Sequence, residues 1–228
     1  MKRIYSHLSA YLVIGLSFIG FAQDLSAEDV LAQMTETAEA VTDASFLLEG
    51  ELVDPDGTVT ILEVDIQIVP EVNAARAEFF QPDALADNFV VLDGEDFYNY
   101  IFLTNQASLF NASDPDALGD IFPQAADNEA FEFTFDLNQL FEGWEPEVLS
   151  FEEGRYTVRL VNTEQDVNIA YVDATTLEGE WLPETLTFSD VDEEVFMTLE
   201  FNEVALDTGL NPDDVIFIPE DAEIIDER

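Results

Sequence analysis

The sequence predicts a mainly β protein with a few helices, built around a sheet that has one apolar face. Three observations lead to this prediction. Apolar and polar residues alternate with a period of two over most of the chain, which is typical of half-buried strands. Turn signals such as Asp93-Gly94 separate these short runs. One amphipathic segment with helical spacing precedes them.

Residues 1–22 are predicted to be a secretory signal peptide that is cleaved before Gln23. They have a positively charged start, and the apolar run from Leu12 to Phe21 is too short for the roughly 20 residues of a bilayer span. An uncleaved membrane anchor stays the alternative. We find no repeat and no linker after the signal, so residues 23–228 are predicted to form a single domain. No cysteine is present, and its core alone must stabilise the domain.

The charge of the chain is strongly negative, with 51 acidic and 6 basic residues and a formal net charge of -45. Lys2 and Arg3 leave with the signal, which contains no acid, so the remainder carries four arginines and a net charge of -47. Such a surface repels nucleic acids and anionic lipid headgroups. The negative charge has two possible explanations. It is either a general property of a salt-tolerant, acid-rich exported proteome, or it serves to recruit a basic partner or calcium. A hydrophobic content of 47% with 19 phenylalanines favours a packed core over disorder.

Residues 24–43 are predicted to form the amphipathic helix. Ser26 and Asp29 have the spacing of an N-terminal capping pair. One apolar face follows at spacings of three and four, made by Val30, Leu31, Met34, Ala38 and Val41. This helix either packs on the core or covers a lipid site.

Strands with alternating apolar and polar residues follow the helix, and turns separate them. Asp54-Pro55-Asp56-Gly57 is predicted to be a hairpin turn rather than a calcium loop, because the further acidic ligands of such a loop are missing. Between Ile61 and Phe110 four strands lie close together in sequence, and each has an apolar face without an obvious catalytic group. In the last of these, the side chains of Tyr98, Tyr100 and Phe102 are expected to share one face.

The second half of the chain is expected to begin with a long loop at 111–128, and loops of this length are usually functional or mobile. A strand at 131–135 and a short helix ending at Gly143 are then expected. The later strands are predicted at 148–151, 156–161, 167–172, 184–188 and 195–204, with Gly154 and Gly179 in turns. The acidic tail from Asn211 to Ile225 is expected to dock through Val215, Phe217 and Ile218.

The residue content argues against most enzyme classes. Without cysteine, and without a histidine after the signal, nucleophilic catalysis and zinc binding lack their usual groups. No nucleophile elbow and no phosphate-binding glycine loop is present. We therefore predict no enzyme, no cofactor and no metal. An exported hydrolase with paired carboxylates stays as a further alternative. Calcium sites at 190–194 and 213–214 are also considered, with solvated acidic turns favoured.

Between about Asp29 and Ile225 the initial helix is followed by a set of marker residues in sequence order, namely Pro70, Gln81-Pro82, Asp93-Gly94, Phe97 to Phe102 before Asn105-Gln106, Phe201-Asn202-Glu203-Val204, and Asp213 to Pro219. In this combination the chain resembles the outer-membrane lipoprotein carrier (LolA) family. It implies a large unclosed antiparallel β-barrel, with helices covering its concave apolar face. Where many family members have an arginine before the strand-ending proline, this chain has Val69, and Arg76 is the nearest base.

The resemblance also implies a function. A periplasmic protein of this family holds the acyl chains of a lipoprotein or related lipid in an apolar cavity, between membrane-bound donor and acceptor proteins, and a monomer is expected. Other members sense envelope stress instead, which is the alternative. The cavity-lining residues are expected to be Phe46, Leu48, Leu62, Val64, Ile66, Ile68, Phe79, Phe89, Val91, Tyr98, Tyr100 and Phe102.

Overall fold

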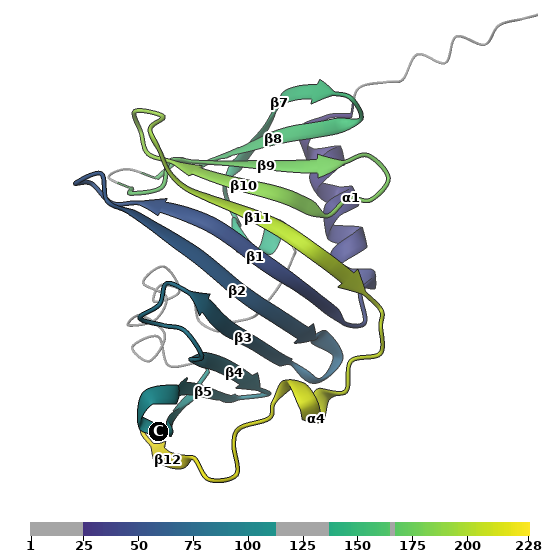
Figure 1. Cartoon of the computed structure of the whole chain (residues 1–228). Coiled ribbons are helices and arrows are strands. Elements are labelled where there is room, and N and C mark those ends of the chain that lie inside the picture. The colour runs from purple at the N-terminus through teal and green to yellow at the C-terminus, as the bar shows by residue number, and fades with distance from the viewer. Residues whose placement is uncertain (1–24, 113–136, 165–166) are drawn as a thin grey trace, which may run out of the picture.

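The structure is a computed structural model that describes residues 25–112, 137–164 and 167–228. Its main feature is one twelve-stranded sheet, which curves without closing into a barrel (Figure 1). The strands are β1 (Ala44–Val53), β2 (Val59–Val69), β3 (Ala74–Gln81), β4 (Phe89–Asp93), β5 (Asp96–Ile101), β6 (Gln106–Asn111), β7 (Glu145–Glu152), β8 (Arg155–Val161), β9 (Tyr171–Leu177), β10 (Pro183–Ser189), β11 (Val195–Leu206) and β12 (Glu223–Asp226). The predicted fold class, mainly β with an open antiparallel sheet, is confirmed.

The strand order is β12-β6-β5-β4-β3-β2-β1-β11-β10-β9-β8-β7. Neighbouring strands are antiparallel except β12, which runs parallel to β6. The long strands β1, β2 and β11 form the centre, where β1 pairs with both β2 and β11. The early and late halves of the chain therefore meet in the middle of one sheet.

Helix α1 (Ala27–Ala40) lies on one face of the sheet, which we call the inner face (Figure 1). The capping pair is confirmed, since the Ser26 hydroxyl accepts a hydrogen bond from the Asp29 backbone N–H and Asp29 bonds back to Ser26. Val30, Leu31 and Met34 of α1 are buried against the inner faces of β8, β9 and β10. Helix α3 (Leu137–Leu140) joins the same cluster through Leu137. No helix in the described part of the chain has the length and apolar composition needed to cross a membrane.

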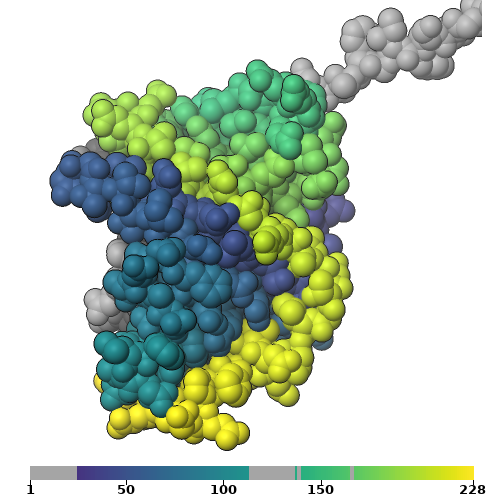
Figure 2. All heavy atoms as spheres, in the orientation of Figure 1, coloured from purple at the N-terminus to yellow at the C-terminus, as the bar shows by residue number. Residues whose placement is uncertain are grey.

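The last residues, 207–228, cover part of the opposite, outer face and are called the C-terminal segment. They contain the short helix α4 (Pro212–Val215) and strand β12, and Figure 2 shows them wrapping the lower part of the molecule. Val215 is buried against Val69 and Ala74, and Ile216 and Ile218 pack on the outer face of β4 and β5. Docking through Val215 and Ile218 is confirmed, whereas Phe217 is 54% exposed and that prediction was wrong.

Two aspartates join the start of β1 to the beginning of the C-terminal segment. Asp43 is buried and accepts hydrogen bonds from the backbone N–H of Thr208 and Gly209 and from the Thr208 hydroxyl. Burial raises the pKa of Asp43, but the hydrogen bonds from Gly209 and Thr208 outweigh it and leave the pKa below its ordinary value. Asp207 in return accepts from Thr42, which lowers the pKa of Asp207.

The other predicted elements have mixed outcomes. The hairpin turn at Asp54–Gly57 joins β1 to β2, and Gly154 and Gly179 occupy turns with φ of 81° and 92°. The strand expected at 167–172 was misplaced, because β9 begins only at Tyr171. Phe102 was expected in a strand but lies in a 3-10 turn, η2 (Phe102–Thr104). The signal peptide, most of the long loop and the strand at 131–135 fall outside the described residues.

Candidate functional site

The inner face of β1 to β5 carries a continuous apolar surface, which we call the inner-face cluster. The strand register aligns its residues in rows that cross the strands. One row runs Phe46, Ile66, Ala77, Val90, and its neighbour runs Ile68, Ala75, Leu92, Phe97. These residues are 8% exposed or less, and every member of the two rows is apolar. It therefore offers a large apolar surface without polar groups that would orient a ligand.

The edge of the inner-face cluster is only half-buried. Leu48, Leu62 and Phe79 pack against it with intermediate exposure, as do Phe110 and Phe201. Leu48 stands opposite Val64, which stands opposite Phe79, so this row crosses β1, β2 and β3. Apolar side chains on the inner face thus continue from a buried centre to a border in contact with water.

Phe201 on β11 connects the inner-face cluster with the cluster beneath α1. It packs against both, and its ring centroid lies 5.4 Å from that of Phe46. The buried residues of α1 belong to the cluster over β8 to β10, and none belongs to the inner-face cluster. Helix α1 therefore covers the late half of the sheet, whereas the inner-face cluster occupies the early half (Figure 1).

The twelve expected cavity residues divide between the two faces. Seven belong to the inner-face cluster, namely Phe46, Leu48, Leu62, Val64, Ile66, Ile68 and Phe79. Phe89, Val91, Tyr98 and Tyr100 instead lie on the outer face, where Ile216, Ile218 and Ala222 of the C-terminal segment pack on them. Phe102 is 58% exposed in η2. The expectation that all twelve line one face was therefore wrong.

The reason for this error is that β4 is apolar on both faces. Phe89, Val90, Val91 and Leu92 are all at most 4% exposed, so alternation alone does not reveal which pair points inward. The structure adds inner-face residues that the sequence analysis missed, namely Ala75, Ala77, Val90, Leu92, Phe97, Phe110, Ala112 and Phe201. Ala75 and Ala77 were recognisable, because they alternate with Arg76 and Glu78 in the same strand as Phe79.

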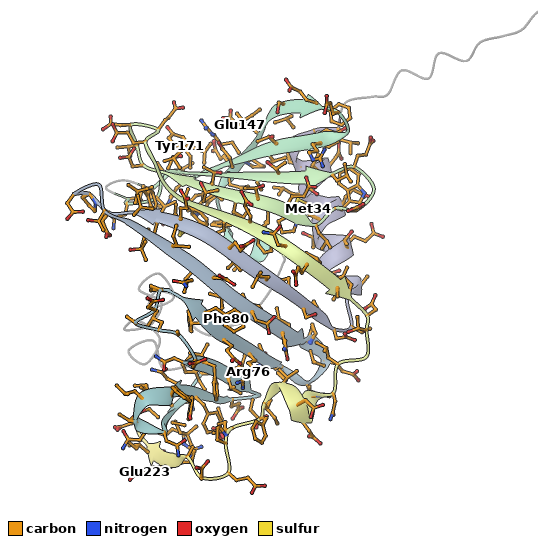
Figure 3. The ribbon with its side chains drawn as sticks, in the orientation of Figure 1. Met34, Arg76, Phe80, Glu147, Tyr171 and Glu223 are labelled. Carbon is orange, nitrogen blue, oxygen red and sulfur yellow. The ribbon has the colours of Figure 1, made fainter. Side chains whose placement is uncertain are left out.

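Arg76 belongs to the outer face and holds the C-terminal segment. Its Nη1 donates to the Phe217 carbonyl oxygen at 2.9 Å, and its Nη2 lies 3.1 Å from the Glu78 carboxylate. Its guanidinium carbon lies 3.7 Å from the centroid of the Phe89 ring. Figure 3 shows Arg76 beside this segment. Val69, where the resembling family has arginine, packs on α4, so neither residue forms a charged latch on the inner face.

A hollow of about 430 Å³ on the central strands is acidic. It is lined by Glu49, Glu51, Glu63 and Glu200 together with Gly50, Ile61, Leu62 and Thr198. Glu49 of β1 stands directly opposite Glu200 of β11 and Glu63 of β2, and we call these three the glutamate row. Like charges in direct opposition repel each other, and ionised carboxylates in a lining disfavour the burial of an acyl chain. The acyl-binding candidate is therefore the inner-face cluster and not this hollow.

The acidic turns considered for calcium have local explanations. The Asp190 carboxylate accepts hydrogen bonds from the backbone N–H of Asp192 and Glu194, which stabilises the turn between β10 and β11. Asp213 and Asp214 lie in the first turn of α4, where negative charge is favourable. Across residues 25–112, 137–164 and 167–228, no group of three or more acidic side chains is placed to hold a metal ion.

Solved structures with a similar fold exist at low sequence identity. An uncharacterized conserved protein from Thermus thermophilus is 18% identical with a TM-score of 0.60, covering 88% of this chain and 98% of that chain. MucB is 15% identical with a TM-score of 0.52, covering 87% of this chain and 65% of that chain. A putative outer membrane lipoprotein-sorting protein domain from Vibrio parahaemolyticus is 12% identical with a TM-score of 0.47, covering 83% and 95%.

No protein-family model matches the chain. No curated protein matches it by sequence. At these identities the likeness to the Thermus protein and to MucB concerns the fold alone. The unclosed antiparallel sheet, with α1 on its inner face and an apolar surface beside it, is the architecture that the sequence resemblance implies. The chain therefore has a LolA-like fold.

Proposed function

We propose that residues 23–228 form a monomeric periplasmic carrier, exported through a cleaved signal peptide, that shields the acyl chains of a lipoprotein or related lipid. The observation that supports this proposal is the inner-face cluster, in which apolar rows cross β1 to β5 without one charged side chain. Membrane-bound donor and acceptor proteins would supply and remove the cargo.

The physical demand on a carrier fits such a surface. Each CH₂ group removed from water contributes about 0.8 kcal/mol, so even one acyl chain needs an extended apolar contact. A chain-shaped ligand has no polar pattern to recognise, and aliphatic and phenylalanine side chains provide contact without demanding hydrogen bonds. The half-buried border at Leu48, Leu62 and Phe79 gives the ligand a place to enter.

Two adjacent phenylalanines of β3 provide the test. Phe79 belongs to the inner-face cluster, whereas Phe80 is 42% exposed and does not (Figure 3). The assay measures binding of a hydrophobic naphthylamine dye, which a synthetic triacylated peptide should displace. Phe79→Asp should weaken dye binding by at least about tenfold, because binding would have to desolvate the new carboxylate. Phe80→Asp should bind as the wild type does. Circular dichroism spectra should be unchanged in both variants, and wild-type binding by a folded Phe79→Asp variant would refute the proposal.

The export part of the proposal has its own measurement. Intact mass analysis of the protein from its native envelope should give an N-terminus at Gln23, and a retained residue 1 would overturn it. Lipid extraction from the same material should yield an acylated molecule.

The alternative is an envelope sensor or interaction domain with the same fold, which carries no lipid. The glutamate row favours it, because a basic partner would relieve the repulsion on the central strands. Native protein that contains no lipid, fails to bind the dye and captures a basic protein through Glu49 would support this alternative and exclude the carrier.

A further inference from the structure

The turn that joins β5 to β6 is free of charge in a chain that is otherwise densely acidic. The sequence has 51 acids in 228 residues, yet no charged residue occurs between Asp96 and Asp114. An acid is expected every four to five residues at that content, so this gap is a local exception. The turn within it, Ile101 to Asn105, is called the β5–β6 tip. It lies at the lower left of Figure 1, between β5 and β12.

The β5–β6 tip exposes three large apolar side chains in succession. Ile101 is 41% exposed, Phe102 58% and Leu103 91%, which makes Leu103 the most exposed large apolar residue among those described. Single exposed apolar residues are ordinary, but three consecutive ones at a projecting turn form a patch. Solubility of the isolated protein would favour a charge here, so the apolar residues indicate a contact.

Hydrogen bonds fix the shape of the β5–β6 tip. The Phe102 backbone N–H donates to Asn88 Oδ1 at 2.9 Å, and the Tyr100 hydroxyl donates to Asn105 Oδ1 at 2.9 Å. Asn105 adopts the left-handed conformation with φ of 52°, and its Nδ2 donates to the Asp221 carbonyl oxygen at 3.0 Å. Because the backbone is already ordered, a contact through Leu103 costs little conformational entropy.

We propose that the β5–β6 tip inserts Ile101, Phe102 and Leu103 into the interface of a zwitterionic phospholipid surface. Aromatic and aliphatic side chains without charge suit that region, where ionised groups are costly. The net charge of the remaining chain would repel anionic headgroups, so a neutral surface is the favourable one. At the foot of the tip, Gln106 Nε2 donates to the Glu223 carboxylate at 3.1 Å, which would stay in the aqueous layer (Figure 3).

Three side chains give a weak and reversible contact. A single myristoyl chain provides an association constant of roughly 10⁴ M⁻¹, and the tip should remain below it. Such a contact orients the protein on a membrane without anchoring it. The proposal goes beyond the carrier function and does not depend on it, because the tip shares no residue with the inner-face cluster.

The turn between β2 and β3 supplies a matched control. This turn, η1 (Pro70–Val72), is also a 3-10 turn that ends at a left-handed asparagine, Asn73 with φ of 50°. Its Val72 is 50% exposed but follows Glu71. Leu103→Trp and Val72→Trp therefore place an indole at exposed positions of two turns of the same type, at the second residue of η2 and at the third residue of η1.

The experiment is fluorescence titration of both full-length variants, without the signal, with phosphatidylcholine vesicles containing brominated lipid. Leu103→Trp should show a blue shift and quenching that Val72→Trp lacks, after subtraction of the signal from the two native tryptophans. In flotation, Leu103→Asp should lower the bound fraction at least tenfold relative to Val72→Asp. Vesicles rich in phosphatidylglycerol should bind less than neutral vesicles at low salt.

Three results would overturn the proposal. The first is an absence of shift for Leu103→Trp at millimolar lipid, and the second is an equal response of Val72→Trp, which would mean nonspecific adsorption. The third is binding to membranes that contain protein but not to pure lipid, which would assign the tip to an apolar groove of a membrane protein. Dye uptake by the inner face is measured separately, so failure of the tip leaves the carrier proposal standing.

Discussion

Replacement of Arg76 by methionine is expected to loosen the C-terminal segment selectively. The Arg76 side chain is 13% exposed and makes three contacts, with the Phe89 ring, the Phe217 carbonyl and the Glu78 carboxylate. Methionine keeps most of the apolar stem, so the loss concerns the charged head and not the packing of the stem. The predicted effect is therefore local to residues 216–228.

The magnitude follows from these contacts. The cation–π contact at 3.7 Å is partly desolvated and should contribute about 1–2 kcal/mol. Water can partly replace the hydrogen bond to the exposed Phe217, so this bond adds about 0.5–1 kcal/mol, and the pair with half-exposed Glu78 adds less. A loss of about 2–3 kcal/mol in the opening free energy corresponds to about 30- to 150-fold faster opening-limited exchange.

Hydrogen–deuterium exchange measures this directly. The Glu223 N–H bonds to the Asn105 carbonyl and the Glu227 N–H to the Leu109 carbonyl, so both amides report on β12. Arg155→Met is the control, because Arg155 is 49% exposed and its pair with Glu184 lies on the late strands. Unchanged exchange of residues 216–228 in Arg76→Met, or a loss of protection spread equally over β1 and β11, would refute the reasoning.

Three further outcomes are expected. Gly50→Ala should lower the free energy of unfolding by about 1–3 kcal/mol in urea titration, because an added Cβ would lie 2.7 Å from the Thr198 carbonyl oxygen, and an unchanged midpoint would contradict this. Asp43→Asn should destabilise the protein at neutral pH. Because the folded-state pKa of Asp43 is depressed, the ionised carboxylate contributes to the free energy of unfolding above pH 3.8, and this contribution is lost as the pH falls below that value. The difference in the free energy of unfolding between the variant and the wild type should therefore shrink as the pH is lowered. Glu49→Gln should raise the melting temperature at low salt, because it removes one charge and thereby two repulsions, with Glu63 and Glu200, of about 0.2–1 kcal/mol each. The gain should fade in molar salt, and a gain that is independent of salt would exclude repulsion as its cause.

The early strands show how much of the fold can be predicted from the sequence. Alternation predicted β1 to β3 correctly, because polar residues such as Glu63, Asp65 and Arg76 mark the outer face unambiguously. In β4 both faces are apolar, and the side that points inward depends on the C-terminal segment, which packs on Val91 from more than a hundred residues away. Periodicity within one strand does not contain this information.

Prediction of the candidate site from the sequence was limited by the same effect. Its centre at Ile66 and Ile68 was predictable, whereas Phe97 and Phe201 enter it through the strand register. Phe97 stands opposite Leu92 across a tight turn, and Phe201 joins because β11 pairs with β1 along its length. Contacts of this kind are decided by the global order of strands, which local patterns do not specify.

The distribution of the arginines connects stability with function. Each of the four arginines after residue 24 forms an ion pair, and Arg228 ties the chain end to both Asp96 and Asp226. None of the four belongs to the inner-face cluster. Ion pairs therefore stabilise the outer face and the C-terminal segment, whereas contacts on the inner face are apolar. A carrier arranged in this way would take up and release an acyl chain with little dependence on salt, while its folded state depends strongly on salt because most of its acids have no base to pair with.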